Sequence, residues 1–523
     1  MNPDTLKVLI AMVSYMCVVI GIGIFFAKKA QQNSENYFIG GRSLGPWVAA
    51  MSAEASDMSG WLLMGLPGLA YWCGLADATW TAICLALGTY VNWLIVAKRL
   101  RKYSAVSGDA ITIPDFLSNR YHEDKKIILG ISALFILIFF TIYASSCLVT
   151  CGKLFAGLFD ADYHAMMILG AIFVVFYTLI GGFLAESASD FMQGIVMFFA
   201  LVTIVGFGVY NAGGFDAVIE NAKEIPGYFS LTSLANPEVD PETGVQLAVN
   251  GVPSFGEPKP YSVLNMASML AWGLGYFGVP QVLLRFMAIK KVSELKKSRR
   301  IATVWVVISL GAAVFIGIIG RSLFPSTPEL ATQSLSENVF VVLAEAMLHP
   351  LFAGVVMAGI LAATISSSDS YLLIAASAFS KNIFEGIIKK DADDKTVMHV
   401  SRAVLLLIAL IGIVIAWDQN SVIFKLVSFA WAGFGATFGP IMLFSLFWKR
   451  TTREGAIAGM LSGGAMVFIW KLGISKLGGL FAIYELLPAF IVSAVVIVLV
   501  SLATKEPCQQ IYDEFERAKN YKD

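Results

Sequence analysis

The sequence is a succession of apolar stretches, each about as long as a lipid bilayer is thick. A helix needs roughly 20 apolar residues to cross a ~30 Å hydrocarbon core. Thirteen such windows lie near residues 5–27, 44–72, 76–97, 127–156, 163–181, 188–212, 264–286, 301–322, 340–380, 399–417, 424–447, 453–472 and 479–503. Only 14% of the residues are charged, against roughly 25% in an average soluble domain. The sequence therefore predicts an all-α polytopic membrane protein with one transmembrane domain over residues 1–523.

Basic residues predict how the chain is oriented. With the N-terminus outside, the loops assigned to the cytoplasm hold 29 of the 37 basic residues, as expected for cytoplasmic loops. These include Arg42, the run Lys98–Lys102 and the cluster Arg285–Arg300. The C-terminus is then cytoplasmic. Basic and acidic residues cancel overall, so no global field favours nucleic acid as a partner.

Two polar segments complete the expected organisation. Residues 213–261 are rich in Pro, Gly and acids, and we expect an external loop or partial lid there rather than a separate domain. Residues 504–523 are polar, and we expect a solvated cytoplasmic tail. The window 5–27 has its positive charges after it, unlike a cleavable signal peptide, so we expect a retained accessory helix.

Two of the thirteen windows carry signals that interrupt a helix. The second contains SAEASDMSG (Ser52 to Gly60), and the seventh contains WGLGYFGVP (Trp272 to Pro280). Glycine and proline weaken a helical ladder, and broken backbone inside a membrane survives only around a protein-lined cavity. The other explanation is that the glycines merely allow close helix packing.

The spacing of the two interrupted windows suggests an inverted repeat. They are five helices apart, and because five is odd, two five-helix units beginning there have opposite orientations. Matching interrupted helices in two inverted halves indicate the midplane site of a secondary transporter. The sequence therefore predicts a core of two inverted five-helix repeats with discontinuous helices.

Oxygen atoms gather in the second and ninth windows. A carboxylate such as Asp57 at membrane depth needs a partner, either a cation such as Na⁺ or neighbouring backbone amides. In the ninth window Ala363, Ser366, Ser367 and Ser370 are spaced i, i+3, i+4 and i+7, which places them on one helical face. Their hydroxyls either complete the shell of a cation or bond to carbonyls of their own helix.

Five motifs resemble the sodium/proline symporter branch of the sodium:solute symporter family. They are FIGGRSLGP (Phe38 to Pro46), SDMSGWLLMGLPG, IGGFLA (Ile180 to Ala185), WGLGYFG with its following proline, and WAGFGATFGP (Trp431 to Pro440). The resemblance implies about 13 transmembrane helices and Na⁺-coupled uptake of L-proline across the plasma membrane of a bacterium. It implies a first repeat over 44–212, a second over 264–447, and accessory helices at 5–27 and 453–503.

The same resemblance implies a set of site residues. Na⁺ would be bound by the backbone carbonyls of Ala55, Met58 and Ala363 and the hydroxyls of Ser366 and Ser367. Na⁺ and proline binding would depend on Asp57, Ser59 and Gly60. The substrate pocket would contain Trp61, Tyr143, Trp272, Tyr276 and Pro280. Arg42 resembles an arginine linked to coupling, and Asp190 retains an acid that we also assign to coupling.

This chain departs from the family pattern at three places. Glu54 adds an acid one turn before Asp57, and it either faces a basic partner or is protonated. The segment Glu186–Asp190 lacks a tryptophan that is common there. Tyr371 stands where Gln is common.

Other functions are weighed against this one. The nearest is a Na⁺-coupled or H⁺-coupled symporter of another amino acid or a small carboxylate. An enzyme is disfavoured because the sequence contains no H-E-x-x-H or P-loop motif. A sensor built on a transporter fold would carry an added signalling domain, and the tail is about twenty residues long.

Overall fold

The computed structural model describes residues 3–30 and 34–521 and is helical over most of that length. Within those ranges, twelve helices are long and apolar enough to cross a membrane. The predicted window 44–72 is not among them because its helix is divided into short pieces. The all-α polytopic architecture predicted from hydropathy is confirmed.

The helices before the long polar loop are α1 (Pro3–Ala30), α2 (Ser34–Ile39), α3 (Pro46–Asp57), α4 (Leu66–Cys73), α5 (Leu75–Val91), α6 (Ala97–Val106), α7 (Ile113–Arg120), α8 (Ile127–Phe159), α9 (Tyr163–Ala212) and α10 (Phe215–Lys223). The later helices are α11 (Val263–Leu270), α12 (Trp272–Gly275), α13 (Pro280–Ala288), α14 (Leu295–Leu323), α15 (Val339–Met347), α16 (Pro350–Ser377), α17 (Asp394–Ile415), α18 (Ile423–Phe447), α19 (Arg453–Leu472), α20 (Leu486–Ala503) and α21 (Gln509–Asn520). π-Helical turns lie at Trp61–Gly65, Asn92–Val96 and Ala378–Ile388.

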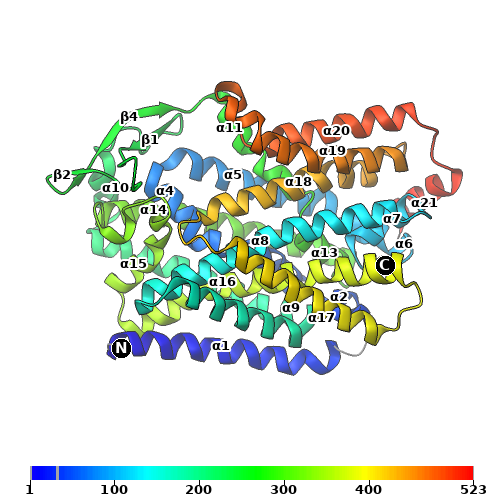
Figure 1. Cartoon of the computed structure of the whole chain (residues 1–523), viewed down its shortest axis with the longest axis horizontal. Helices are drawn as coiled ribbons and strands as arrows, with labels where there is room; N and C mark the ends of the chain where they lie inside the picture. Colours follow the sequence, from blue (N-terminus) through cyan, green and yellow to red (C-terminus); the bar gives the residue numbers. More distant parts are fainter. Residues whose placement is uncertain (1–2, 31–33, 522–523) are drawn as a thin grey trace.

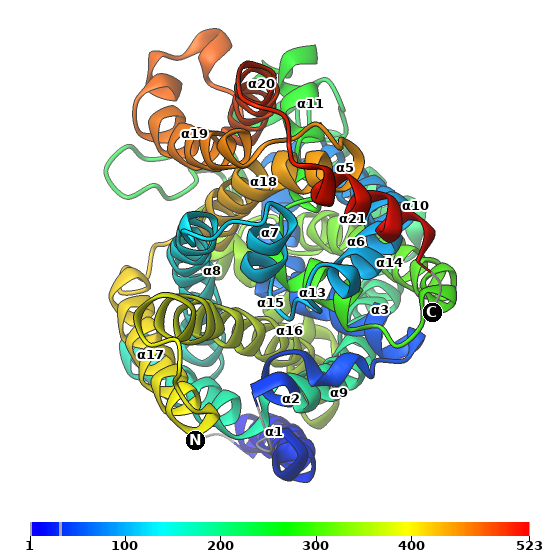
Figure 2. The same ribbon diagram turned by 90° about the vertical axis from the view of Figure 1, so that its right-hand side faces the viewer.

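The helices are arranged around a central group. In Figures 1 and 2, α1 lies along one edge and the pair α19 and α20 along the opposite edge. α1 packs against α9 and α16, while α19 and α20 pack against each other and α18. Between these edges α3 packs against α9, α13, α14 and α16. The interrupted helices therefore lie inside the protein, where broken backbone is shielded from lipid.

The second segment is broken, as predicted. α3 ends at Asp57, the amide of Met58 still donates to the Glu54 carbonyl, and the chain resumes at Trp61 with a π-helical turn that leads into α4. Gly60 lies against α8, because a Cβ there would be 2.4 Å from the Thr150 hydroxyl oxygen. The break therefore depends on a residue without a side chain at this contact.

The seventh segment is also broken, as predicted. The short helix α12 ends at Gly275, and α13 begins at Pro280. Proline has no amide hydrogen and favours the first position of a helix. Gly278 lies against α18, because a Cβ there would be 2.3 Å from the Phe434 carbonyl oxygen.

Three predicted windows are divided or joined in the structure. The window 340–380 is divided at Pro350 into α15 and α16, since proline begins a new helix more readily than it continues one. The windows 163–181 and 188–212 are joined in α9 across a bend at Gly182, whose φ of 60° favours glycine. That bend lies in the motif IGGFLA.

The polar loop folds back onto the helices. β1 (Ser233–Pro237) pairs antiparallel with β4 (Phe255–Pro260), and β2 (Ala248–Val249) pairs with β3 (Val252–Pro253). The Tyr228 hydroxyl donates to the Ala70 carbonyl at 2.8 Å, and the Leu75 amide donates to the Tyr228 carbonyl at 2.9 Å. The loop therefore contacts the junction of α4 and α5.

The prediction of a solvated tail is wrong. Residues 509–520 form α21, which packs against α6. Ile511 and Phe515 are each 6% exposed, and the Arg120 guanidinium lies 5.6 Å from the centre of the Phe515 ring. The tail is polar in composition, but its few apolar residues share one helical face, and that face is buried.

Candidate functional site

Oxygen atoms of α3 and α16 meet beside the first break. The Ala55 carbonyl accepts hydrogen bonds from the hydroxyls of Ser366, at 2.8 Å, and Ser367, at 3.3 Å. Ser366 also donates to the Ala363 carbonyl at 3.2 Å. Four of the five predicted Na⁺ ligands therefore lie together in a fully buried position. Hard cations favour such oxygen ligands.

The fifth predicted ligand lies at the break itself. Met58 directly follows the last residue of α3 and has non-helical backbone angles of φ −84° and ψ 66°. Its carbonyl therefore lies outside the α3 helix. Met58 is three residues after Ala55 in the sequence, and its place among the Na⁺ ligands stays a prediction.

The Asp57 side chain faces the other broken segment. It is fully buried, with one oxygen accepting from the Tyr276 hydroxyl at 2.8 Å and the other from the Gln281 side-chain amide at 3.3 Å. Tyr276 follows α12, and Gln281 is the second residue of α13. The carboxylate thus joins the two breaks. Its partners are side chains of the seventh segment rather than backbone amides.

Aromatic rings surround the junction. The rings of Trp61 and Trp272 lie 6.3 Å apart, and Tyr276 packs edge-on against Trp431 at 5.0 Å. Trp272 also stacks on Tyr484 at 5.2 Å. Sequence reasoning did not assign Trp431 or Tyr484 to the pocket. Trp431 lies in the quoted motif WAGFGATFGP, whereas nothing in the sequence distinguished Tyr484.

The other predicted pocket residues lie close to this junction. The Tyr143 hydroxyl reaches the Asp57 carbonyl at 3.4 Å, and its ring stacks on Tyr371 at 4.2 Å. Pro280 is the first residue of α13. Two buried donors, the Ser59 hydroxyl and the Trp272 indole nitrogen, have no hydrogen-bond partner within the described chain. Buried donors of this kind are costly unless a ligand or water pairs with them.

Glu54 has a neutral partner. Its carboxylate accepts a hydrogen bond from the Trp93 indole at 3.1 Å, and the Trp93 ring packs on Phe286 at 4.5 Å. The expectation of a basic partner is wrong for the contacts in the described chain. The Glu54 side chain therefore extends from α3 to the π-helical turn Asn92–Val96.

Arg42 lies away from the aromatic rings, at the end of α13. Its guanidinium donates to the Met287 carbonyl at 2.8 Å and to the Ala110 carbonyl at 2.8 Å, and it pairs with Asp109 at 2.9 Å. The neighbouring residue Leu44 bonds through its backbone to Ala288 and Lys290. Arg42 therefore fastens the segment before α3 to the last turn of α13.

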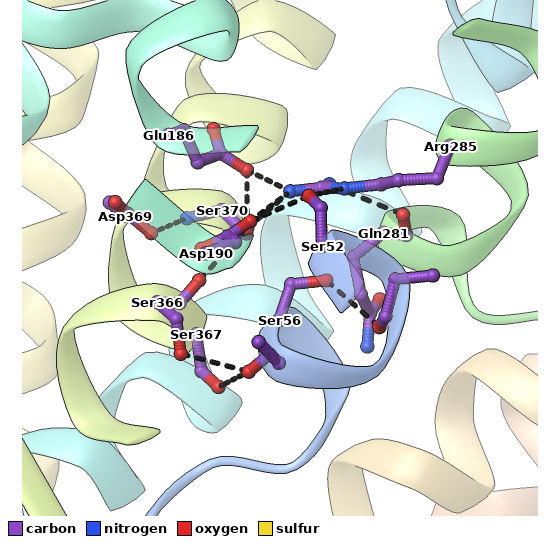
Figure 3. Close-up of polar contacts among 12 residues, drawn as sticks. Ser52, Ser56, Glu186, Asp190, Gln281, Arg285, Ser366, Ser367, Asp369 and Ser370 are labelled. Carbon is purple, nitrogen blue, oxygen red and sulfur yellow. Dashed lines mark hydrogen bonds and ion pairs between the residues drawn. The ribbon is translucent and has the colours of Figure 1, made fainter. Parts of the chain in front are cut away.

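Asp190 belongs to a buried ionic cluster, shown in Figure 3. It accepts from the Ser52 hydroxyl at 2.7 Å and lies 3.2 Å from the Arg285 guanidinium. Glu186 and Ser370 bond to the same guanidinium. Placing Arg285 in a cytoplasmic loop was wrong, because it is fully buried in α13 and carboxylates of α9 pair with it.

The serines on one face of α16 therefore contact two different groups. Ser366 and Ser367 face Ala55, and Ser370, one turn on, faces Arg285. Helical spacing predicts a shared face, but it does not show that two helices from different parts of the chain divide that face.

Comparisons with known proteins agree with this geometry. The model of the sodium:solute symporter family matches residues 37–463. The chain is 41% identical over 492 residues to the high-affinity proline transporter PutP of Bacillus subtilis (strain 168), covering 94% of this chain and 97% of that protein. It is 39% identical over 499 residues to a sodium/proline symporter of Staphylococcus aureus (strain USA300), covering 94% and 92%.

Solved structures share the fold at low sequence identity. A substrate-bound, outward-open Na⁺-coupled sialic acid symporter superposes with a TM-score of 0.73 at 17% identity, covering 96% of this chain and 99% of the other. The nucleobase-cation-symport-1 family transporter Mhp1, in a closed conformation, gives a TM-score of 0.53 at 12% identity, covering 94% and 99%. With the family model spanning most of its length and two broken helices at its centre, this chain belongs to the sodium:solute symporter family.

Proposed function

We propose that this protein takes up L-proline together with Na⁺ across the bacterial plasma membrane by alternating access. The observation that carries the proposal is the Asp57 side chain, which ties the two broken segments together beside a buried group of oxygen atoms. The identity of the substrate is inferred from the relatives named as proline transporters, which are similar over 94% of this chain.

Na⁺ is bound between α3 and α16 in this proposal. Its ligands are the carbonyls of Ala55, Met58 and Ala363 and the hydroxyls of Ser366 and Ser367. The hydroxyls now donate to the Ala55 carbonyl, so they would rotate to present lone pairs to an arriving cation. The ion would then draw the two helices together more firmly than two neutral hydrogen bonds do.

Proline is bound at the aromatic junction. It is a zwitterion, so its pocket needs donors for a carboxylate and acceptors for an ammonium. The unpaired Ser59 hydroxyl and Trp272 indole are candidate donors, and the aromatic faces attract the ammonium. The proposed contacts come from Asp57, Ser59, Gly60, Trp61, Tyr143, Trp272, Tyr276 and Pro280.

The proposed organisation follows the two repeats. Residues 44–212 and 264–447 form the inverted halves, residues 5–27 and 453–503 are accessory helices, and residues 504–523 form the tail. The excess of basic residues in the loops assigned to the cytoplasm supports an N-terminus outside and a C-terminus in the cytoplasm. Arg42 and Asp190, which both contact residues of α13, act in coupling.

The membrane potential is sufficient to drive such uptake. With one Na⁺ for each proline, one net charge moves inward per cycle. At about 100 mV this releases roughly 2.3 kcal/mol, which supports about a fifty-fold concentration ratio. A Na⁺ gradient adds to that ratio.

The test is uptake of labelled proline into proteoliposomes under an imposed Na⁺ gradient. We expect accumulation that requires Na⁺ and is reduced by unlabelled proline but not by other amino acids or small carboxylates at equal concentration. Uptake that continues at full rate without Na⁺ and follows a pH step would contradict Na⁺ coupling. Strong inhibition by another solute would contradict the substrate.

A further inference from the structure

Arg285 contacts both helices of the proposed Na⁺ site and α9, which packs against them. Its Nε donates to the Ser52 hydroxyl of α3 at 3.0 Å, and its Nη2 donates to the Ser370 hydroxyl of α16 at 2.9 Å. Nη2 also bonds to Glu186 and Asp190 of α9. In Figure 3 the side chain extends from α13 into the middle of these groups. It is fully buried.

The two serine contacts lie one helical turn from proposed Na⁺ ligands. Ser52 is three residues before Ala55, and Ser370 is four residues after Ser366, which are spacings of about one turn. Ser370 also donates to the Ser366 carbonyl at 3.0 Å. Arg285 thus spans α3 and α16 one turn from the place where Na⁺ would span them.

The same side chain is fixed to the substrate side of α13. Its Nη1 donates to the Gln281 carbonyl at 3.2 Å, and the Gln281 side chain donates to Asp57. A change in the position of the guanidinium therefore affects the first turn of α13, where the proposed pocket lies. α13 is nine residues long, so this turn and Arg285 belong to one short rigid element.

We propose that Arg285 is a positioning residue that transmits Na⁺ occupancy to α13, an inference that rests on the proposed function. With Na⁺ bound, α3 and α16 are close enough for one guanidinium to hold both Ser52 and Ser370, and α13 is locked. When Na⁺ leaves, the two helices separate, and Arg285 loses one of these contacts. The carboxylates of α9 retain the guanidinium, and α13 is released to move relative to α3 or α16.

The geometry requires a guanidinium rather than any positive charge. Arg285 directs Nε to α3 and Nη2 to α16 while Nη1 bonds to the first turn of its own helix, and the planar fork of arginine provides these directions. A lysine ammonium keeps the charge near Glu186 and Asp190 but donates from a single point. Arg285→Lys therefore separates the charge of the residue from its ability to connect helices.

The first test compares wild type with Arg285→Lys in proteoliposomes, by measuring radiolabelled Na⁺ and proline fluxes in parallel. We expect a proline-independent Na⁺ flux that rises roughly tenfold, as loss of one charged hydrogen bond implies, and a higher ratio of Na⁺ to proline. The matched control is Arg321→Lys, a second buried arginine that bonds to the Tyr71 carbonyl and Gln246. It should keep the wild-type ratio.

The second test cuts each contact alone, so that a folding defect in Arg285→Lys does not decide the outcome. Ser52→Ala and Ser370→Ala should each raise the proline-independent Na⁺ flux, whereas Ser377→Ala should not, because the Ser377 hydroxyl donates within α16, to the Ile374 carbonyl. A wild-type flux ratio in Arg285→Lys and in both serine variants would overturn the inference. Absence of Na⁺-driven proline uptake in wild type would instead overturn the proposed function.

Discussion

The two broken segments interrupt their helices in different ways. The second breaks at polar residues, and around its break Ala55 and Asp57 make contacts through oxygen atoms to α16 and the seventh segment. The seventh breaks at glycines followed by Pro280, and its glycines lie against backbone and rings of other helices. One break therefore presents oxygen atoms to its neighbours, while the glycines of the other allow close packing.

The two segments share the contacts around Asp57 but differ in what surrounds each break. Hydrogen bonds connect the second segment to α9, α13 and α16. The glycines of the seventh segment pack closely against other helices, while its Tyr276 and Gln281 side chains donate to Asp57. Asp57 is therefore the contact through which the second segment meets the seventh.

The largest expected effect comes from removing that contact. Asp57→Ala leaves the Tyr276 hydroxyl and the Gln281 amide without their partner in a buried site. We expect the initial rate of Na⁺-driven proline uptake to fall by roughly a hundredfold or more, as two lost bonds to a charged group imply. Asp77→Ala is the control, because Asp77 also accepts from a tyrosine, Tyr261, which belongs to neither break. Equal losses in the two variants would contradict a special role for Asp57.

The next effect concerns the ligand side of the comparison. Ser366→Ala removes one proposed Na⁺ ligand and the hydroxyl that meets Ala55 at 2.8 Å. The apparent KM for Na⁺ should rise roughly tenfold, while the KM for proline at saturating Na⁺ changes less. Ser377→Ala, also on α16, should leave both values unchanged. An unchanged Na⁺ dependence in Ser366→Ala would remove this residue from the site.

A smaller effect on transport, but a clear one on stability, is expected on the packing side. Gly278→Ala puts a Cβ 2.3 Å from the Phe434 carbonyl, and backbone cannot move aside easily. Overpacking of this kind costs about 1–3 kcal/mol, so the Tm of the protein in detergent should fall. In Gly311→Ala the added methyl meets nothing within 4 Å, and the Tm should not fall. The KM for Na⁺ should be unaltered in both variants.

The smallest effect is expected at Glu54. Glu54→Gln retains an oxygen that accepts from the Trp93 indole, so uptake should change by less than about threefold. Glu54→Leu, which leaves Trp93 unpaired, should be impaired more. Severe loss in the Gln variant would show that the acid itself, rather than the acceptor, is needed in the transport cycle.

Much of the fold followed from the sequence because bilayer thickness and helix breakers act locally. The apolar windows predicted the helices, and the glycines and Pro280 predicted the break in the seventh segment. The division at Pro350 was missed because a hydropathy window sums residues without regard to backbone direction. The docking of α21 was missed because its apolar face is small and the surface that receives it comes from α6.

The site was predictable where one helix sets the geometry. The i, i+3, i+4 spacing placed Ala363, Ser366 and Ser367 on one face, and they do gather around Ala55. Arg285 was missed because counting charges near a loop cannot reveal carboxylates that approach from α9. Contacts between distant segments depend on packing, which single-sequence patterns do not record.

The docked tail gives access to the helices of the candidate site from the end of the molecule where α21 lies. α21 covers α6, and Arg101 of α6 donates to the Ile289 carbonyl just after α13. A fluorophore or antibody fragment attached to α21 is thus linked to the segment that carries Gln281 and Arg285 through two contacts. These are the packing of α21 on α6 and the bond from Arg101 to Ile289. Such a probe would report conformational changes of individual molecules during transport, without chemical labelling of the pocket.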